Sequence, residues 1–131
     1  MTTPPRALPK PTEAELAILN VLWKRGPVTV RQVHEDLLAS RPTGYTTVLK
    51  LMQIMTEKGL VRRDETDRTH IYAPRLTEQK TQRQLLSDLV ERAFDGSAAR
   101  LVIQALSLKR STPEELDEIK KLLAAHEGEK S

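Results

Sequence analysis

A polar cluster within residues 44–50, GYTTVLK, carries side chains that suit contact with nucleic acid. Thr46 and Thr47 have small hydroxyls that can bond a base or a phosphate, and methyls that can pack on a thymine methyl. Lys50 follows one helical turn later and therefore projects from the same side, with Gln53 a further turn along. This pattern favours DNA contact. The alternative is that the two threonines only cap the helix.

A basic hairpin is expected directly after this helix, because the apolar period changes from 3.6 to 2 beyond Gly59. Its strands are predicted at 60–63 and 68–73, joined by the acidic turn 64–67. Such a hairpin can lie against a phosphate backbone, and the acidic turn indicates that the strand residues make the contact. The alternative is a solvated hairpin whose arginines are partly neutralised by that turn. The backbone-contacting residues are predicted to be Arg62, Arg63, Arg68 and Thr69.

Three helices are expected before the hairpin, each with an apolar stripe at helical spacing. The first begins at a capping box, Thr12 with Glu15, and ends at Gly26. The second follows a short β-branched run at 28–30, and the third contains the polar cluster and ends at Gly59. Three helices followed by a two-stranded wing are typical of the winged helix-turn-helix fold. Its buried positions are predicted at Leu16, Ile18, Leu19, Leu22, Trp23, Val30, Val33, Leu37, Leu38, Val48, Leu51, Met52 and Met55.

The second half of the chain is predicted to be helical throughout. Thr77, Ser97 and Thr112 each stand where they can cap a helix, and the last of these is followed by Pro113 at the first helical position. The fold class is therefore mainly α with a small β-wing: a winged helix-turn-helix followed by a helical domain.

Composition supports a two-part protein. The chain has 131 residues, of which 38% are hydrophobic but only 3% aromatic, so an aliphatic core is expected. Residues 1–75 carry 12 Lys and Arg against 8 Asp and Glu, whereas residues 76–131 carry 9 against 10. A basic front half and a nearly neutral back half suit a nucleic-acid module joined to an assembly module.

Several classes of protein are disfavoured by what the sequence lacks. There is no cysteine, which excludes disulfides and thiolate metal sites. His34, His70 and His126 are far apart in sequence, so neither a metal nor another cofactor is expected. No Gly-rich phosphate loop, nucleophile elbow or paired carboxylate set indicates an enzyme or any catalytic residue. Without an apolar run of membrane-spanning length or a secretory signal, no membrane insertion and a cytoplasmic location are expected.

Three stretches resemble the penicillinase-repressor (BlaI/MecI) family of transcriptional repressors: PTEAELAILNVLWKRGPVTVRQVHEDL, YTTVLKLMQIMTEKGLVRR and RTHIYAP. The resemblance covers about residues 10–75 closely and continues loosely to about 125. It implies a homodimer that binds a palindromic operator in double-stranded DNA and blocks transcription, with antibiotic resistance as one expected context. By position it implies base contacts from Thr46, Thr47 and Lys50. It also implies backbone contacts from the wing residues Arg62, Arg63, Arg68 and Thr69, and further backbone contacts are predicted from Tyr45 and Gln53.

The helices after residue 77 resemble the arms through which members of this family dimerise. A single chain of these helices could hardly bury all of its leucines, which fits such a role; the alternative is that they fold back onto the winged domain. The domains are predicted as a disordered arm at 1–11, a winged-helix domain at 12–75, a dimerisation domain at 76–126 and a frayed tail at 127–131. The dimerisation residues are predicted to be Leu85, Leu86, Leu89, Val90, Leu101, Val102, Leu106, Leu116, Ile119, Leu122 and Leu123.

The sequence departs from the family pattern at two informative places. Ile54 stands where many relatives carry an arginine, so a phosphate contact is not expected there. In the β-lactam branch a membrane sensor-protease triggers cleavage of an Asn-Phe bond. The matching stretch LVIQALS has Gln104–Ala105 instead, so that candidate cleavage site and a sensor-protease partner are not assumed. The rival function is a winged-helix protein–protein adaptor that does not bind DNA, with Leu49 and Ile54 on its docking surface.

Overall fold

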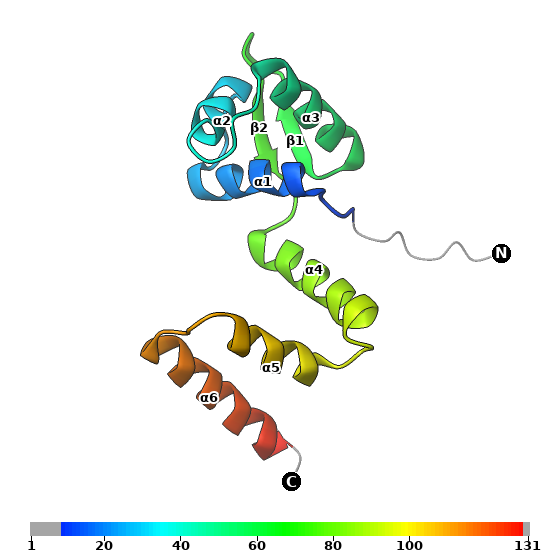
Figure 1. The fold of residues 1–131 in the computed structure, drawn as a ribbon. Coiled ribbons are helices and arrows are strands. Elements are labelled where there is room, and N and C mark those ends of the chain that lie inside the picture. Colours follow the sequence, from blue (N-terminus) through cyan, green and yellow to red (C-terminus); the bar gives the residue numbers. More distant parts are fainter. Residues whose placement is uncertain (1–8, 130–131) are drawn as a thin grey trace, which may run out of the picture. The chain divides into compact units, whose positions relative to one another are not determined.

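The computed structural model describes residues 9–129, which form six helices and one hairpin in two compact units, residues up to Leu86 and residues from Ser87. The predicted domain boundary lies earlier, at residues 75–76. Most of the predicted N-terminal arm and the end of the predicted tail lie outside the described residues. The elements, drawn in Figure 1, are α1 (Glu13–Arg25), α2 (Val30–Leu37), α3 (Tyr45–Lys58), β1 (Val61–Asp64), β2 (Ile71–Pro74), α4 (Glu78–Ala93), α5 (Ala98–Leu108) and α6 (Pro113–Glu129).

In the first unit, α1, α2 and α3 gather around an antiparallel pair of strands, the winged-helix arrangement (Figure 1). The β-branched run at 28–30, whose residue types favour a small strand, forms only one bridge, in which Val28 and Tyr72 exchange two backbone hydrogen bonds of 3.1 and 2.8 Å. It stops there because Thr29 already caps α2: the Thr29 side chain accepts from the Gln32 amide while the Gln32 side chain accepts from the Thr29 amide.

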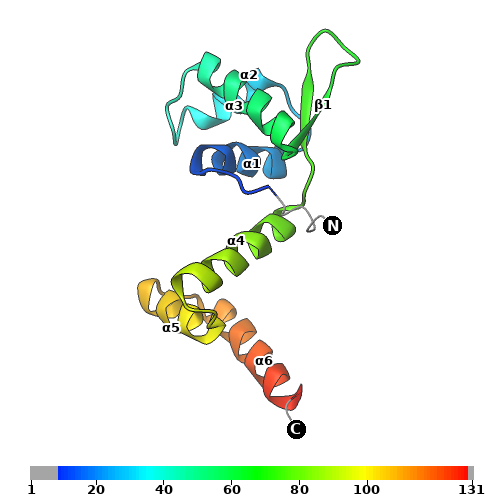
Figure 2. The same ribbon diagram turned by 90° about the vertical axis from the view of Figure 1, so that its right-hand side faces the viewer.

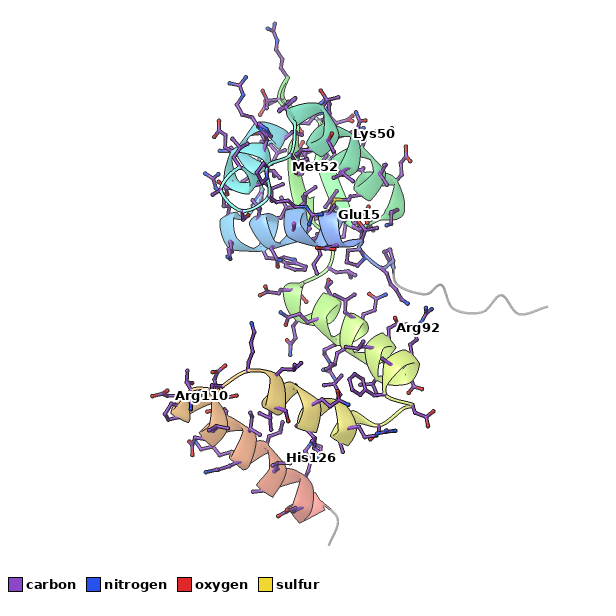
Figure 3. The ribbon with its side chains drawn as sticks, viewed as in Figure 1. Glu15, Lys50, Met52, Arg92, Arg110 and His126 are labelled. Carbon is purple, nitrogen blue, oxygen red and sulfur yellow. The ribbon has the colours of Figure 1, made fainter. Side chains whose placement is uncertain are left out.

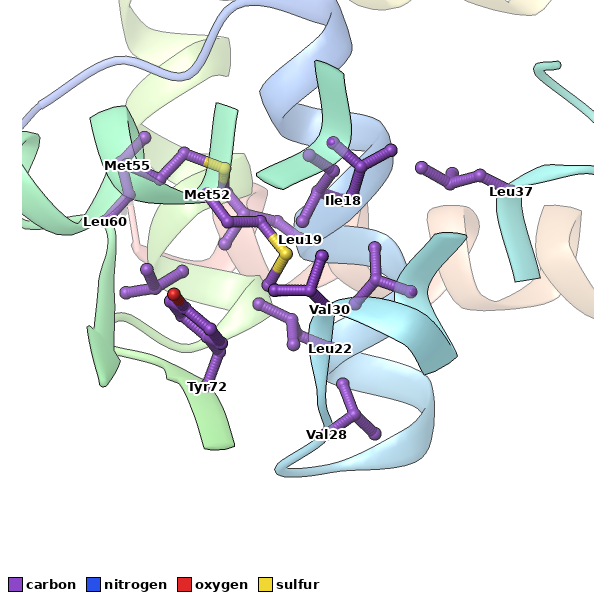
Figure 4. Close-up of a cluster of buried hydrophobic side chains, with 13 residues drawn as sticks. Ile18, Leu19, Leu22, Val28, Val30, Leu37, Met52, Met55, Leu60 and Tyr72 are labelled. Carbon is purple, nitrogen blue, oxygen red and sulfur yellow. The ribbon is translucent and has the colours of Figure 1, made fainter. Parts of the chain in front are cut away.

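The core of this unit is mainly aliphatic, as predicted, and joins all three helices to the hairpin (Figure 4). One prediction about it was wrong: Leu38 is 49% exposed, because α2 ends at Leu37 and the chain then turns towards α3. Leu16, Trp23 and Leu51 are only half-buried. Tyr72, which was not expected in the core, is 1% exposed. The buried apolar residues are Ile18, Leu19, Leu22, Val28, Val30, Val33, Leu37, Val48, Met52, Met55, Leu60, Val61 and Tyr72.

A buried carboxylate joins the start of α1 to the end of α3. Glu15 is 2% exposed; it completes the predicted capping box with Thr12 and accepts a hydrogen bond of 2.6 Å from Lys58 Nζ. Burial alone raises the pKa of Glu15, but the hydrogen bonds from Lys58 and Thr12 outweigh it, so the pKa lies below its ordinary value of 4.5. The charged form of Glu15 therefore stabilises the fold.

Replacing Glu15 with alanine is expected to lower the free energy of unfolding by about 2 to 3 kcal/mol, because the variant loses a cap and a charge-assisted hydrogen bond. Thermal unfolding followed by circular dichroism measures this, with Glu13→Ala as the control. Glu13 makes only an exposed ion pair of 3.7 Å with Arg41, so its loss should cost under about 0.5 kcal/mol.

The same carboxylate predicts a pH dependence. Because the folded-state pKa is depressed, its contribution to stability is fully present above pH 4.5 and is lost as the pH falls through the folded-state pKa. Glu15→Gln should therefore show a shallower loss of stability below pH 4.5 than the parent protein. Equal acid sensitivity of the two proteins would contradict this role for Glu15.

The remaining helices begin where their caps were predicted. The hydroxyl of Thr77 accepts from the Lys80 amide at the start of α4, and Ser97 caps α5. At the start of α6, Thr112 and Glu115 exchange hydrogen bonds of 2.8 and 3.1 Å as a capping box. The turn between α4 and α5 has positive φ angles at Asp95 and Gly96, 52° and 78°. Glycine adopts such an angle without strain, and aspartate tolerates it better than most residues. Helix α6 runs to Glu129, into the predicted tail.

Candidate nucleic-acid interface and dimerisation surface

The first turn of α3 is exposed and has no side-chain cap. Gly44 occupies the N-cap position, so Tyr45, Thr46 and Thr47 form the first turn, and the hypothesis that the threonines only cap this helix is wrong. Within residues 9–129 neither threonine hydroxyl has a hydrogen-bond partner. The amides of a helix's first turn have no acceptor inside the helix, and the helix dipole adds partial positive charge there. This end of α3 is therefore suited to meeting a phosphate or a base edge.

The outward side of α3 continues this polar surface. Thr46, Lys50 and Gln53 recur at spacings of four and three, and all three are exposed. Figure 3 labels Lys50 together with Met52, which the same helix places in the core. The polar residues that the sequence singled out thus lie opposite the buried stripe and leave the fold intact if substituted.

The strands of the wing begin later than predicted, at Val61 and Ile71 instead of residues 60 and 68. Strand β2 begins at Ile71, so Arg68 and Thr69 lie in the loop 65–70 rather than in a strand (Figure 2). The loop is longer than the predicted acidic turn because Asp64 accepts hydrogen bonds from the amide and the hydroxyl of Thr66, which forms a local turn before the second strand. Arg68 and Thr69 are consequently carried by the loop, so any phosphate contact that they make would come from the loop and not from a strand.

The arginines of the wing differ in how far neighbouring groups neutralise their charge. Arg63 forms an ion pair with Glu65 and stands opposite Tyr72 in the strand register, and the Tyr72 hydroxyl together with Glu65 raises the pKa of Arg63. In the part of the chain that the structure describes, Arg62 and Arg68 have no ion pair. Hydrogen bonds from Thr66 lower the pKa of Asp64 and keep it charged. Arg62 and Arg68 therefore offer the uncompensated positive charge.

A hollow on the first unit brings three elements together: the first turn of α2, the first turn of α3 and the wing loop. Its lining includes Arg31, Tyr45, Arg68 and Thr69. Sequence reasoning missed Arg31, which is exposed one residue into α2. The overlooked signal was Thr29 followed by Gln32 three residues later, a capping box that fixes where α2 begins.

The helices of the second unit expose their apolar stripes. From Ser87 to Gly128 no residue is buried, and Leu122 and Leu123 are 61% and 55% exposed. All eleven predicted dimerisation residues are exposed or only half-buried within the single chain. An apolar surface of this extent normally marks an interaction site, and the second unit by itself does not cover it.

The candidate cleavage site, the bond between Gln104 and Ala105, lies inside a helix. Gln104 and Ala105 are both exposed on α5. A protease would have to open that helix locally before cutting it. Cleavage at this bond is still not assumed. No helix within residues 9–129 is long and apolar enough to cross a membrane, and the same residues contain no cluster of three or more His, Asp or Glu side chains that could hold a metal.

Fold and site together define a winged helix-turn-helix protein. The solution structure of the DNA-binding domain of the repressor BlaI shares this fold, with a TM-score of 0.50 and 22% identity over 56% of this chain and 89% of that domain. A family model described as penicillinase repressor matches residues 11–125. This chain belongs to the penicillinase repressor family, as its sequence motifs predicted.

Two relatives span nearly the whole chain. The transcriptional regulator BlaI of Mycobacterium tuberculosis (strain CDC 1551 / Oshkosh) is 36% identical over 117 residues, covering 88% of this chain and 84% of that protein. The penicillinase repressor of Bacillus licheniformis is 21% identical over 125 residues, covering 95% and 98%. The similarity therefore includes the helices after the wing as well as the winged unit.

Proposed function

We propose that this protein is a sequence-specific transcriptional repressor that binds a palindromic operator as a homodimer. The observation that carries the proposal is the open first turn of α3, where the hydroxyls of Thr46 and Thr47 have no hydrogen-bond partner among residues 9–129 and Lys50 is exposed on the same side. The names of two relatives, a transcriptional regulator and a penicillinase repressor, support the same function. Occupying promoter DNA would block transcription.

In this proposal α3 enters the major groove with its first turn against the bases. Thr46, Thr47 and Lys50 supply base contacts, because their donors and methyls match the groove's hydrogen-bonding and thymine-methyl pattern. Tyr45 and Gln53 flank them towards the backbone. Most of the affinity comes from phosphate contacts, which carry little sequence information.

The phosphate contacts are assigned to the wing and to the start of α2. Arg62 and Arg68 have no compensating ion pair among the described residues, and Arg31 shares the hollow with Arg68. Thr69 adds a neutral donor from the same loop. Arg63 is assigned a weaker contact than its neighbour, because Glu65 already neutralises part of its charge.

A homodimer is proposed because the second unit leaves its leucines uncovered. A second copy of the same chain presents the same apolar stripes, so a two-fold pairing would bury them on both sides. Two recognition helices related by that axis would then read half-sites about 34 Å apart or a multiple of it.

The competing function is a protein–protein adaptor that uses the face of α3. One observation favours it: Ile54 is 37% exposed on that helix. Leu49, however, is half-buried and packs against the core, which leaves little contiguous apolar surface. An adaptor also has no need for unpaired arginines on an adjacent wing.

Selection of binding sequences from a random duplex library separates the two functions. The proposal expects recovery of a palindrome whose affinity falls by a factor of about 10³ or more between about 50 mM and about 200 mM salt, as for a protein with six or more phosphate contacts. If no sequence is enriched and duplex affinity does not depend steeply on salt, the result favours the adaptor function instead.

Replacing Arg68 with alanine is expected to weaken binding to all duplexes about equally and to reduce the slope of log affinity against log salt by about 0.9, the value for one phosphate contact. Arg25→Ala is the matched control, because Arg25 lies at the end of α1 and already pairs with Asp36 at 3.1 Å. A salt slope unchanged by the Arg68 substitution would remove this residue from the contact surface.

A further inference from the structure

The two helices of the helix-turn-helix touch through a pair of rings. The ring of His34, on the last turn of α2, lies edge to face with the ring of Tyr45, at a centroid separation of 5.8 Å and an interplanar angle of 84°. His34 is half-buried, whereas Tyr45 is 46% exposed at the first position of α3. Such perpendicular ring pairs are favourable and have a preferred geometry.

Beyond this ring contact, no hydrogen bond or ion pair among the described residues holds the side chain of Tyr45. The preceding Gly44 contributes no side chain, and the start of α3 carries no side-chain cap. Tyr45 lines the same hollow as Arg68 and Thr69. Ordering an exposed side chain on binding lowers affinity, and a side chain that is already ordered before binding avoids that cost.

We infer that His34 is a positioning residue for DNA binding: its ring holds the ring of Tyr45 so that the tyrosine hydroxyl meets a backbone phosphate beside the recognition helix. The inference rests on the proposed function. His34 itself does not contact DNA in this arrangement and acts only through Tyr45.

The test compares operator affinity of the full-length protein in four variants: His34→Ala, His34→Phe, Tyr45→Ala and the double variant His34→Ala with Tyr45→Ala. We expect His34→Ala to weaken binding by about three- to tenfold, the range that loss of one aromatic contact allows. His34→Phe, which keeps a ring, should bind within about twofold of the parent. In the Tyr45→Ala background the histidine substitution should change nothing further, because its partner is already absent.

Glu35→Ala is the matched control, since Glu35 is the exposed next residue of α2 and should bind like the parent. Circular dichroism at the binding temperature establishes that each variant is folded. If His34→Ala does not fold, His34→Gln, which removes the ring but keeps a polar side chain of similar length, takes its place in the cycle with Tyr45→Ala, with the same expected loss. Equal losses from the histidine substitution in both tyrosine backgrounds would overturn the positioning role. A parent protein that binds no duplex would overturn the proposed function itself.

Discussion

Leu123→Asp is expected to turn the proposed homodimer into a monomer and to lower affinity for the full palindromic operator by about 100-fold or more. Leu123 lies on one stripe of α6 with Leu116 and Ile119, at spacings of three and four. It is 55% exposed in the single chain, so the substitution leaves the folding of the chain largely untouched. Its effect would fall on the association of two chains.

The size of the effect follows from symmetry. A two-fold axis places each substitution in the interface twice. Covering a whole leucine contributes about 1.5 to 3 kcal/mol, and Leu123 is 55% exposed, so the two copies together amount to about 1.5 to 3 kcal/mol. Burying an unpaired carboxylate in the same place adds a further penalty. Since about 1.4 kcal/mol is a tenfold change in an equilibrium constant, the dimer dissociation constant should rise by at least about 100-fold.

Sedimentation equilibrium gives the oligomeric state, and the same samples are titrated with full and half operators. Ala124→Asp is the control, because it introduces the same charge at an exposed position of α6 off the leucine stripe. Half-operator affinity should be equal for parent and variant, since the winged unit has its own core. A Leu123→Asp protein that stays dimeric at micromolar concentration would contradict the assigned dimerisation surface.

The elements that the sequence predicted correctly have local causes. Capping residues fixed the starts of α1, α4, α5 and α6, because a cap is a contact between residues three apart. Gly59 ends α3 with φ 83° for an equally local reason. The polar side of α3 followed from helical spacing alone.

The errors arose where distant residues decide the outcome. The alternation of side chains along the second strand predicted that Tyr72 and Ile71 lie on opposite faces, but it did not predict which face is buried. That choice is made by Val28, which pairs with Tyr72 from 44 residues away and turns the tyrosine inward. One error had a local cause instead: the turn in which Asp64 accepts from Thr66 was not predicted, and the second strand begins only at Ile71, so Arg68 lies in the loop.

The candidate site shows the same division. The residues of α3 could be named from their spacing, since one helix carries them. The sequence did not predict that Arg31 lines the same hollow as Arg68, because that hollow exists only after α2 has packed beside α3 and the wing. The ring contact of His34 with Tyr45 is also tertiary: it spans the turn of the helix-turn-helix, whose geometry no apolar period specifies.

Lys50→Ala is expected to remove preference at one base pair of each half-site. Lys50 lies one turn after Thr46, is exposed, and has no ion pair among the described residues, so its ammonium is free to donate to a base edge. A good base contact of this kind discriminates against the wrong base by about 1 to 3 kcal/mol. The variant should therefore bind operators altered at that position nearly as well as the parent operator.

A binding series over every single-base change in one half-site measures this. The parent protein should lose about tenfold or more at the position read by Lys50, and the variant should lose that dependence while keeping the others. Lys24→Ala is the control, because Lys24 is an exposed lysine at the end of α1, away from the recognition helix. A uniform loss over all sequences would instead assign Lys50 to a phosphate, because charge neutralisation weakens every duplex alike. In that case Thr46 and Thr47, with the free amides beside them, would be left to choose the sequence.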